Sequence, residues 1–428
     1  MRLLDTKSGG EKALYEILEK RNSGTQVGVR ESVSEIIDNV RKYGDKAIRF
    51  YSEKFGEVPP ESLEFTTEQI DATAEAADKS VIEVIKKAAA NIEEYHRYQL
   101  STGYEFKRGG RSFGRVVRPL QKVGVYIPGG TAAYPSTVLM DCIPAKLAGV
   151  EEIIMATPIK GGSLSPIIAA AAKIAGVTRI FAMGGAQAVA AFAYGTESVP
   201  RVDKIVGPGN MYVAEAKRQV YGNVDIDMIA GPSEVLIVAD ETANPDFIAA
   251  DMLSQLEHDA AAAAVLLTDS TDIAQRTSEA LESQLSKLSR KDIASISAEN
   301  FAIAVVCESI EEVMRISNNV APEHLEIQCN QPRKLLAYVK NAGSVFLGNY
   351  TTEPLGDYYA GTNHVLPTNG SARFSSPLSV DDFVKKFSYL EYDKNSFIED
   401  APNTAIFADS EGLTAHAAAV RIRLEQLK

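Results

Sequence analysis

The chain has 428 residues, of which 45% are hydrophobic and 24% charged, as in ordinary soluble globular proteins, and its length predicts two or more domains. A net charge of −13 makes nucleic acids and anionic membrane surfaces poor candidate partners. The sequence shows neither the apolar core of a signal peptide nor a run long enough to span a bilayer, so a cytoplasmic protein is expected.

The predicted elements change in type along the chain. The first hundred or so residues are helical in pattern, with apolar side chains at helical spacing in "ESVSEIIDNVRKYG" and "VIEVIKKAAANIEEYHRYQL". From residue 123 short β runs alternate with Ala-rich helices, as in "VGVYIP" followed by "STVLMDCIPAKLAG". A second such stretch begins at "SEVLIVAD" (233–240) and continues through "AAAAVLLTD", "FAIAVVCES" and "GSVFLGNY". This alternation predicts two α/β units with parallel sheets covered by helices, followed from about residue 370 by an arm that ends in a helix.

Three glycine turns join predicted strands to predicted helices, in "IPGGTAAYPST", "MGGAQAVA" and "GPGNMYVAEA". Such turns let backbone N–H groups approach a phosphate at a helix N-terminus. None matches the GxGxxG dinucleotide pattern with an acidic residue about 20 positions later. Taken alone, the turns favour tight β–α connections over nucleotide binding.

The three cysteines, Cys142, Cys307 and Cys329, stand far apart, so they form neither a disulfide framework nor a CxxC metal pair. Cys307 ends an apolar run and is expected in the core. Cys142 could be a nucleophile, but no histidine or asparagine lies near it in sequence, and a buried structural thiol is the favoured interpretation.

The stretch "NVAPEHLE" (319–326) places Glu323 and His324 directly behind a proline. One interpretation is a helix start, because proline suits the first helical position and an acid complements the helix dipole. The other is a general acid/base pair, because Glu and His are the usual proton carriers. The local sequence allows both.

Of the five histidines, His96 lies in "EEYHRYQL" and is expected at a surface or partly buried helix position. In "DMLSQLEHDAA", Gln255 and His258 are three residues apart, on one face of a predicted helix. An amide oxygen and an imidazole at this spacing can share a metal ion, but a polar, solvated helix face would look the same.

Two more histidines lie in polar settings. "GDYYAGTNHVLPT" holds Asp357 and His364 in a predicted loop, and "EGLTAHAAAVRIRL" holds Glu411 and His416 near a helix start. Because no paired thiols are present, any metal site would use imidazole, carboxylate and amide ligands, for which zinc is the first choice and manganese or cobalt follow. Spacing alone does not show that these segments converge.

Eight motifs taken together resemble one family. "SQLEHD", "APEHLEI", "EPLGDYYAGTNHVLPT" and "EGLTAHAAAVRIRL", with "GVYIPGGTAAYPSTVLM", "GGAQAVAAFAYGTESVP", "DKIVGPGN" and "AGPSEVLIVAD", resemble histidinol dehydrogenase over essentially the whole chain. That family oxidises L-histidinol to L-histidine, the last two steps of histidine biosynthesis, with two NAD molecules and a bound aldehyde intermediate.

The resemblance implies a role for each matching position. It implies zinc ligands at Gln255, His258, Asp357 and His416, and an acid/base pair at Glu323 and His324. It implies substrate contacts at Ser233, Gln255, His258, His324, Asp357, Glu411 and His416. It implies NAD contacts at Tyr126, Gln187 and Asn210. The role of His364 stays open, and it is not expected to bind the metal.

The fold implied by the resemblance is two related, incomplete Rossmann-like units with parallel sheets and small helical tails, in an intertwined homodimer whose Glu411 and His416 enter the other subunit's site. The expected segments are an N-terminal helical tail (1–23), a helical segment associated with the second α/β unit (24–112), a first Rossmann-like domain with the NAD contacts (113–232), a second with the zinc and acid/base residues (233–370), and a C-terminal arm (371–428).

The expected chemistry begins at His324, whose ordinary pKa near 6.5 suits a base that takes the hydroxyl proton at neutral pH. Glu323 would activate the water that adds to the aldehyde. A zinc-dependent hydrolase with Glu323 activating a metal-bound water is the alternative enzyme class, and a non-catalytic binding protein of two α/β units is another.

Overall fold

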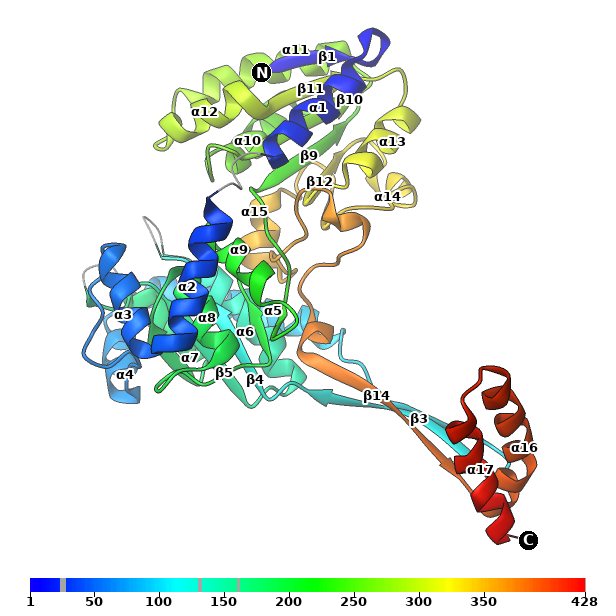
Figure 1. Cartoon of the computed structure of the whole chain (residues 1–428). Helices are drawn as coiled ribbons and strands as arrows, with labels where there is room; N and C mark the ends of the chain where they lie inside the picture. The colour runs from blue at the N-terminus through cyan, green and yellow to red at the C-terminus, as the bar shows by residue number, and fades with distance from the viewer. Residues whose placement is uncertain (24–27, 130–132, 160–161, 428) are drawn as a thin grey trace. The chain divides into compact units, whose positions relative to one another are not determined.

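The computed structural model describes residues 1–23, 28–129, 133–159 and 162–427, which form two compact units (Figure 1). The large unit comprises Met1–Gln99 and Leu120–Phe383, and the small unit comprises Leu100–Pro119 and Val384–Lys428. Within the described ranges, every helix is too short or too polar to cross a membrane.

The first sheet of the large unit is parallel, as the alternating pattern predicts. Its strands, in spatial order, are β6 (Arg179–Ala182), β5 (Glu152–Thr157), β4 (Lys122–Tyr126), β7 (Lys204–Val206) and β8 (Asp225–Ile226). Its helices are α6 (Pro135–Ala148), α7 (Pro166–Ala175), α8 (Gly185–Tyr194) and α9 (Met211–Val220).

The second sheet of the large unit is also parallel. Its strands, in spatial order, are β1 (Arg2–Asp5), β11 (Ala302–Val306), β10 (Ala263–Thr268), β9 (Glu234–Ala239), β12 (His324–Gln328) and β13 (Ser344–Leu347). Its helices are α1 (Gly10–Ser23), α10 (Pro245–Leu256), α11 (Thr271–Leu285), α12 (Lys291–Phe301), α13 (Ile310–Val320), α14 (Pro332–Leu336) and α15 (Glu353–Leu355). The edge strand β1 lies in the segment that was expected to be helical throughout. The two α/β units with parallel sheets are confirmed.

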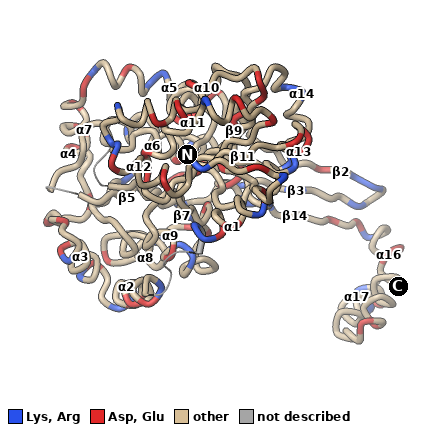
Figure 2. The backbone as a smooth tube through the Cα atoms, turned by 90° about the horizontal axis from the view of Figure 1, so that it is seen from above, with Lys and Arg blue, Asp and Glu red and all other residues tan. Residues whose placement is uncertain are grey.

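The buried apolar side chains of the helical segment pack mainly against the first sheet. The segment, which was expected to associate with the second α/β unit, also contacts that unit, where Asn91 donates to the carbonyl of Tyr359 at 2.8 Å. Its helices are α2 (Val29–Tyr43), α3 (Asp45–Lys54), α4 (Thr67–Glu75) and α5 (Lys79–Arg97). Val33 and Ile48 share a buried cluster with Phe181 of β6, and Ile92 shares another with Val125 of β4. Both basic and acidic residues occur along α2 and α3, as the blue and red segments of Figure 2 show.

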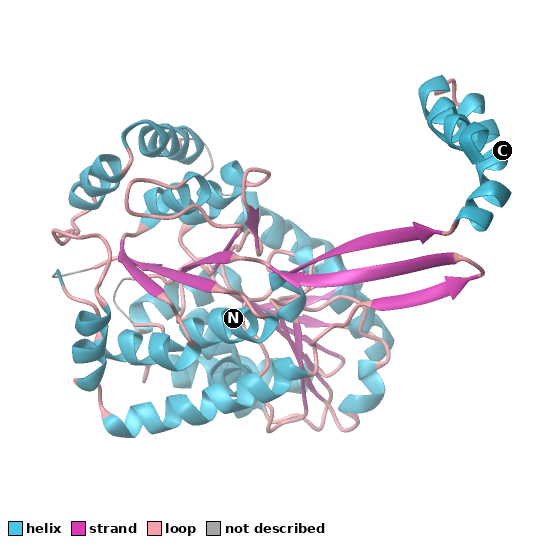
Figure 3. Ribbon diagram, turned by 90° about the horizontal axis from the view of Figure 1, so that it is seen from below, coloured by secondary structure: helices cyan, strands magenta, loops and turns pink. Residues whose placement is uncertain are grey.

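The small unit contains a three-stranded antiparallel sheet that the sequence analysis missed. Its strands, in order, are β14 (Val384–Tyr392), β3 (Arg111–Pro119) and β2 (Tyr104–Arg108) (Figure 3). Two helices follow, α16 (Lys394–Ser410) and α17 (Thr414–Leu427), where one was expected. Arg111 anchors α16 to this sheet through ion pairs with Glu399 and Asp400.

The expectation that His96 lies at a surface or partly buried position is wrong, because its side chain is fully buried. Its Nδ1 lies 2.8 Å from the carbonyl of Ile92, and Asn363 donates to its Nε2 at 3.2 Å. Asn363 also donates to the carbonyl of Met140. His96 therefore ties α5 to the loop that carries the "GTNH" motif. The three cysteines are buried and free, as expected.

A buried acid lies in the core of the first sheet. Asp141 is fully buried, and neither of its carboxylate oxygens has a hydrogen-bond partner among the described residues. Burial, with the nearby charge of Asp227, raises the pKa of Asp141 well above its ordinary value, although Lys217 opposes this. Burial therefore disfavours the ionised form of this carboxyl group in the folded chain.

Replacing Asp141 with asparagine is expected to raise the free energy of unfolding at neutral pH by about 1–3 kcal/mol. Because the pKa of Asp141 is higher in the folded chain than in the unfolded chain, the folded chain binds more protons between the two pKa values, and stability falls there as pH rises, by up to about 1.4 kcal/mol per pH unit. Denaturant unfolding of both proteins from about pH 4 to pH 8 tests this, because the gain should grow with pH. Parallel pH dependences would contradict it.

Candidate active site

The stretch "NVAPEHLE" begins a strand, so the helix-start interpretation is wrong. Helix α13 ends at Val320, and Ala321 caps it in the left-handed conformation with φ of 52°. Pro322 disfavours a helical conformation at the residue before it, which helps to end the helix there. Strand β12 then starts at His324, opposite Val235 of β9. The Glu–His pair therefore lies at the start of a buried parallel strand.

The two side chains of the pair meet at the neighbouring strand β9. Glu323 Oε2 accepts a hydrogen bond from the backbone N–H of Glu234 at 2.9 Å and lies 3.8 Å from His324 Nδ1. His324 Nδ1 lies 3.1 Å from the carbonyl oxygen of Glu234 and donates to it. Both side chains are buried. This arrangement leaves His324 Nε2 as the nitrogen that faces the rest of the site.

Asp357 lies on the other side of the imidazole, in the π-helical turn Gly356–Ala360 that follows α15. Its Oδ1 is 3.5 Å from His324 Nε2. Burial alone would lower the pKa of His324, but the carboxylates of Glu323 and Asp357 raise it to about 10. The expectation of an ordinary histidine pKa therefore fails for the chain alone, because the imidazole lies between two acids.

Burial raises the pKa of Glu323 to about 7, although the charge of His324 and the N–H of Glu234 oppose this. A carboxyl group with this pKa exchanges a proton readily near neutral pH. Glu323 is thus well suited to act as a general base. The bond to the N–H of Glu234 fixes its direction.

Gln255 and His258 lie at the end of α10. Gln255 is in its last turn, and His258 lies two residues beyond its final residue, so the pair does not share a regular helix face. The Gln255 side chain is fully buried, and neither its oxygen nor its nitrogen has a hydrogen-bond partner among the described residues. The charges of Asp357 and His324 both act on His258, which places all three in one electrostatic environment.

Three side chains of this region could hold a cation. His324, Glu353 and Asp357 each offer a ligand atom, and these atoms lie within 4.8 Å of one another. A buried amide without partners, such as that of Gln255, calls for a ligand, and the neighbouring Ser254 donates to Glu353 of this group. The donor set of nitrogen and oxygen atoms therefore fits a divalent metal of the zinc, manganese or cobalt group.

Glu353 is a residue that the sequence analysis missed. It is buried, and burial together with the charge of Asp357 raises its pKa to about 8. Its backbone N–H donates to Glu326 at 2.9 Å, and Ser254 donates to its side chain at 3.1 Å. Its position four residues before Asp357 in "EPLGDYY" is a signal that could have drawn attention to it.

A buried acidic network lies behind the site. Gln328 donates from its amide to both Glu326 and Asp251, at 2.8 Å each, and Thr352 donates to Asp251 at 2.6 Å. Burial and the charge of Asp251 raise the pKa of Glu326 well above its ordinary value. Because Glu326 also accepts from the Glu353 N–H, this network holds the turn that carries Asp357.

The remaining predicted substrate residues divide between the two units. Ser233 directly precedes β9 and is half-buried in the large unit. Glu411 and His416 belong to the small unit, where both are exposed. Their contribution to an active site stays a prediction.

The three residues expected to contact NAD lie together at one edge of the first sheet. Tyr126 ends β4, Gln187 lies in the first turn of α8 after β6, and Asn210 caps α9 after β7. The hydroxyl group of Tyr126 accepts from the N–H of Gly185 at 3.1 Å, and both side-chain polar atoms of buried Gln187 are without partners among the described residues. Ligands of open α/β sheets bind at this carboxyl edge.

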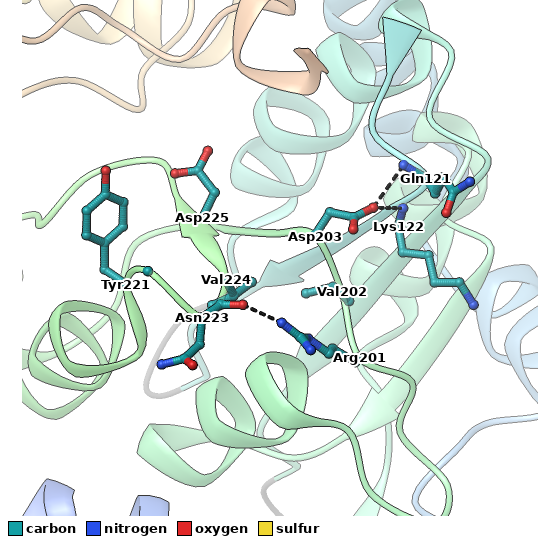
Figure 4. Close-up of a pocket in the computed structure, with 10 residues that line it drawn as sticks. Gln121, Lys122, Arg201, Val202, Asp203, Tyr221, Asn223, Val224 and Asp225 are labelled. Atoms are coloured by element: carbon teal, nitrogen blue, oxygen red, sulfur yellow. Dashed lines mark hydrogen bonds between the residues drawn. The ribbon is translucent and has the colours of Figure 1, made fainter. Parts of the chain in front are cut away.

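A cavity of about 570 Å³ opens at the opposite, amino-terminal edge of the first sheet (Figure 4). Its polar groups are largely bonded to one another: Asp203 accepts from the N–H groups of Gln121 and Lys122, and Arg201 donates to the carbonyl of Asn223. Because its polar groups are already hydrogen-bonded to one another, this pocket is no candidate for the active site.

The fold and the site together are those of an α/β enzyme: Glu323 and His324, two buried side chains that can carry protons, adjoin side chains able to hold a cation. A family model described as histidinol dehydrogenase matches residues 19–424. The histidinol dehydrogenase of Clostridium acetobutylicum is 50% identical over 423 residues, 98% of each chain. That of Listeria innocua is 48% identical over 417 residues, 97% of this chain and 98% of the relative.

A crystal structure of histidinol dehydrogenase from Elizabethkingia anophelis has the same fold, with a TM-score of 0.93 at 38% identity, over 100% of this chain and 98% of the other. The chain therefore belongs to the histidinol dehydrogenase family.

Proposed function

We propose that this protein catalyses the zinc-dependent, four-electron oxidation of L-histidinol to L-histidine through bound histidinaldehyde, with two NAD molecules, as the final steps of histidine biosynthesis in the cytoplasm. Family membership supports the substrate and the reaction class. The observation that carries the proposal is the buried arrangement of Glu323 and His324 against Asp357, because it supplies two proton carriers at one place.

The metal would be held by Gln255, His258 and Asp357, with His416 from a second copy of the chain. The partnerless Gln255 amide and the N/O donor set support this assignment. When bound, zinc would anchor the amine and the imidazole of the substrate and offset the charge of Asp357, which lowers the pKa of His324 toward a value suited to a base. Further substrate contacts would come from Ser233, and from Glu411 of the second copy.

The proton steps fall to the chain's own residues. His324 takes the hydroxyl proton at Nε2, because its Nδ1 is already committed to the carbonyl of Glu234. His324 then releases this proton to solvent. Glu323, with a pKa of about 7, takes a proton from the water that adds to the aldehyde, and the free His324 takes the hydroxyl proton of the hydrate in the second oxidation. NAD accepts the hydride in each step. Tyr126, Gln187 and Asn210 hold the cofactor at the carboxyl edge of the first sheet.

A homodimer with shared active sites is part of the proposal. The small unit leaves large apolar side chains exposed on its strands and helices, namely Phe387, Leu390, Ile406, Phe407, Leu413 and Ile422. Such an apolar surface is typical of a contact with another chain. A second copy that buries it would also receive Glu411 and His416.

The test is to mix the purified protein with L-histidinol and NAD, with and without a chelator, and to count the reduced nicotinamide formed. Two NADH per histidinol, lost on chelation and restored by zinc, are expected. One NADH per histidinol would indicate a simple alcohol dehydrogenase. No NADH from metal-loaded protein would refute the proposal, and hydrolysis without NAD would favour the zinc hydrolase.

Replacing His258 with asparagine is expected to weaken zinc binding by at least about 10–100-fold, because even the loss of an outer-shell partner has this effect. Turnover should fall with the zinc content of the dialysed protein, measured by metal analysis. The matched control is His364→Asn. His364 donates to the backbone carbonyl of Asp357 and is no proposed ligand itself, so its variant should lose less zinc than His258→Asn, which removes a ligand. Full zinc occupancy in His258→Asn would refute the ligand assignment.

A further inference from the structure

Arg21 of helix α1 is a buried charge that the proposed chemistry does not use. Only 1% of its side chain is exposed. Its Nη1 donates to Glu234 Oε2 and its Nε to the carbonyl of Ala261, each at 2.6 Å. Its Nη2 donates to the carbonyls of Pro232 and Ser233. The guanidinium group thus binds the segment that leads into strand β9, through the carbonyls of Pro232 and Ser233 and the side chain of Glu234.

The same segment of β9 orients the acid/base pair. The Glu234 peptide N–H donates to Glu323 at 2.9 Å, and the Glu234 carbonyl accepts from His324 Nδ1 at 3.1 Å. The position of this one residue therefore sets the direction of the Glu323 carboxylate and the tautomer of His324. A histidine whose Nδ1–H is fixed in this way presents Nε2 as its basic nitrogen.

The Glu234 side chain has few other supports. Its Oε1 accepts from the N–H of Asn369 at 3.1 Å, and its Oε2 is paired with Arg21. Glu234 itself is buried. Removal of the guanidinium would leave an unpaired buried carboxylate, which the structure would relieve by moving the start of β9 or by taking up a proton.

We propose that Arg21 is a positioning residue for the reaction. It holds Glu234, and through the Glu234 peptide it fixes the orientation of the Glu323 carboxylate and of the His324 imidazole. This inference rests on the proposed function. The alternative is that Arg21 only stabilises the fold. The two differ because a positioning role changes the rate of the chemical step in correctly folded molecules, whereas a purely structural role changes only the fraction of molecules that fold.

The experiment compares Arg21→Lys and the double variant Arg21→Met/Glu234→Gln with wild type. Lysine keeps the charge but cannot make the forked contacts, and the double variant leaves no unpaired buried charge. The matched control is Arg179→Met, which removes a forked ion pair with Glu64 in the first sheet. Zinc content, thermal midpoint and the Michaelis constant for histidinol are measured for each protein.

The deciding measurement is the single-turnover rate of NADH formation with zinc-loaded enzyme in excess over histidinol, because this rate constant does not depend on the inactive fraction. In both Arg21 variants this rate constant should be about 10–100-fold lower than in wild type. With histidinol deuterated at the carbinol carbon, the isotope effect on the rate constant should be at least as large in the variants as in wild type. Arg179→Met should lower the thermal midpoint and leave the rate unchanged.

Single-turnover rates at the wild-type value in both Arg21 variants would overturn the inference, whatever their stability. A wild-type protein that forms no NADH from histidinol would instead refute the proposed function. The two failures are therefore distinct.

Discussion

Replacing Glu323 with glutamine is expected to slow the aldehyde-to-acid half-reaction by about 10²–10⁴-fold, the usual contribution of a general base, and to slow the alcohol-to-aldehyde half-reaction less. Glutamine keeps the size of the side chain and can still accept from the N–H of Glu234. It cannot take a proton from water. The aldehyde should therefore accumulate, and the NADH formed per histidinol in a short assay should fall from two toward one.

The two half-reactions are measured separately, by supplying histidinol in one assay and histidinaldehyde in another. In wild type, the aldehyde step should lose rate as pH falls below about 7, because burial raises the pKa of Glu323 to that value and the protonated acid is no base. The variant should lack this pH dependence. Equal losses in both half-reactions would refute the role of Glu323.

Glu326→Gln is the matched control. Glu326 is a buried acid three residues further along the chain, and it accepts from the Glu353 N–H. Its variant should slow both half-reactions alike. A selective loss of the aldehyde step in Glu326→Gln would show that a general disturbance of β12, and no specific base, accounts for the effect.

The α/β units were predictable from sequence because their strands are continuous apolar runs between glycine turns. Strand β9, for example, is buried at every position. The small sheet was missed because its strands carry no such run: all five residues of β2 are exposed, and β14 is mostly exposed. In addition, β14 pairs with β3 across about 270 residues of sequence, from Tyr392↔Arg111 to Val384↔Pro119.

The candidate site was only partly predictable for a similar reason. Glu323 and His324 are adjacent in sequence, so their chemistry was visible, but their backbone conformation was not, because proline suits a strand entry as well as a helix start. The pairing of Arg21 with Glu234 joins two elements 213 residues apart, which no local pattern reveals. The raised pKa of His324 depends likewise on Asp357, which another segment brings within 3.5 Å.

The predicted metal ligands are divided between the two units of the chain. The imidazole of His416 is exposed on the small unit, whereas Gln255, His258 and Asp357 lie in the large unit. We propose that His416 binds the metal in the site of a second copy of the chain. In a two-fold symmetric dimer, each site would then combine Glu323 and His324 of one chain with Glu411 and His416 of the other.

Mixing an inactive His324→Asn variant with an inactive His416→Asn variant is therefore expected to restore activity after subunit exchange. Half of the dimers would be mixed, and each mixed dimer would hold one intact site and one doubly altered site, so recovery should approach about a quarter of wild-type activity. His324→Asn mixed with Glu323→Gln is the control and should show no gain, because both changes lie on the same chain's share of the site. Absence of recovery despite demonstrated exchange would place His416 in its own subunit's site.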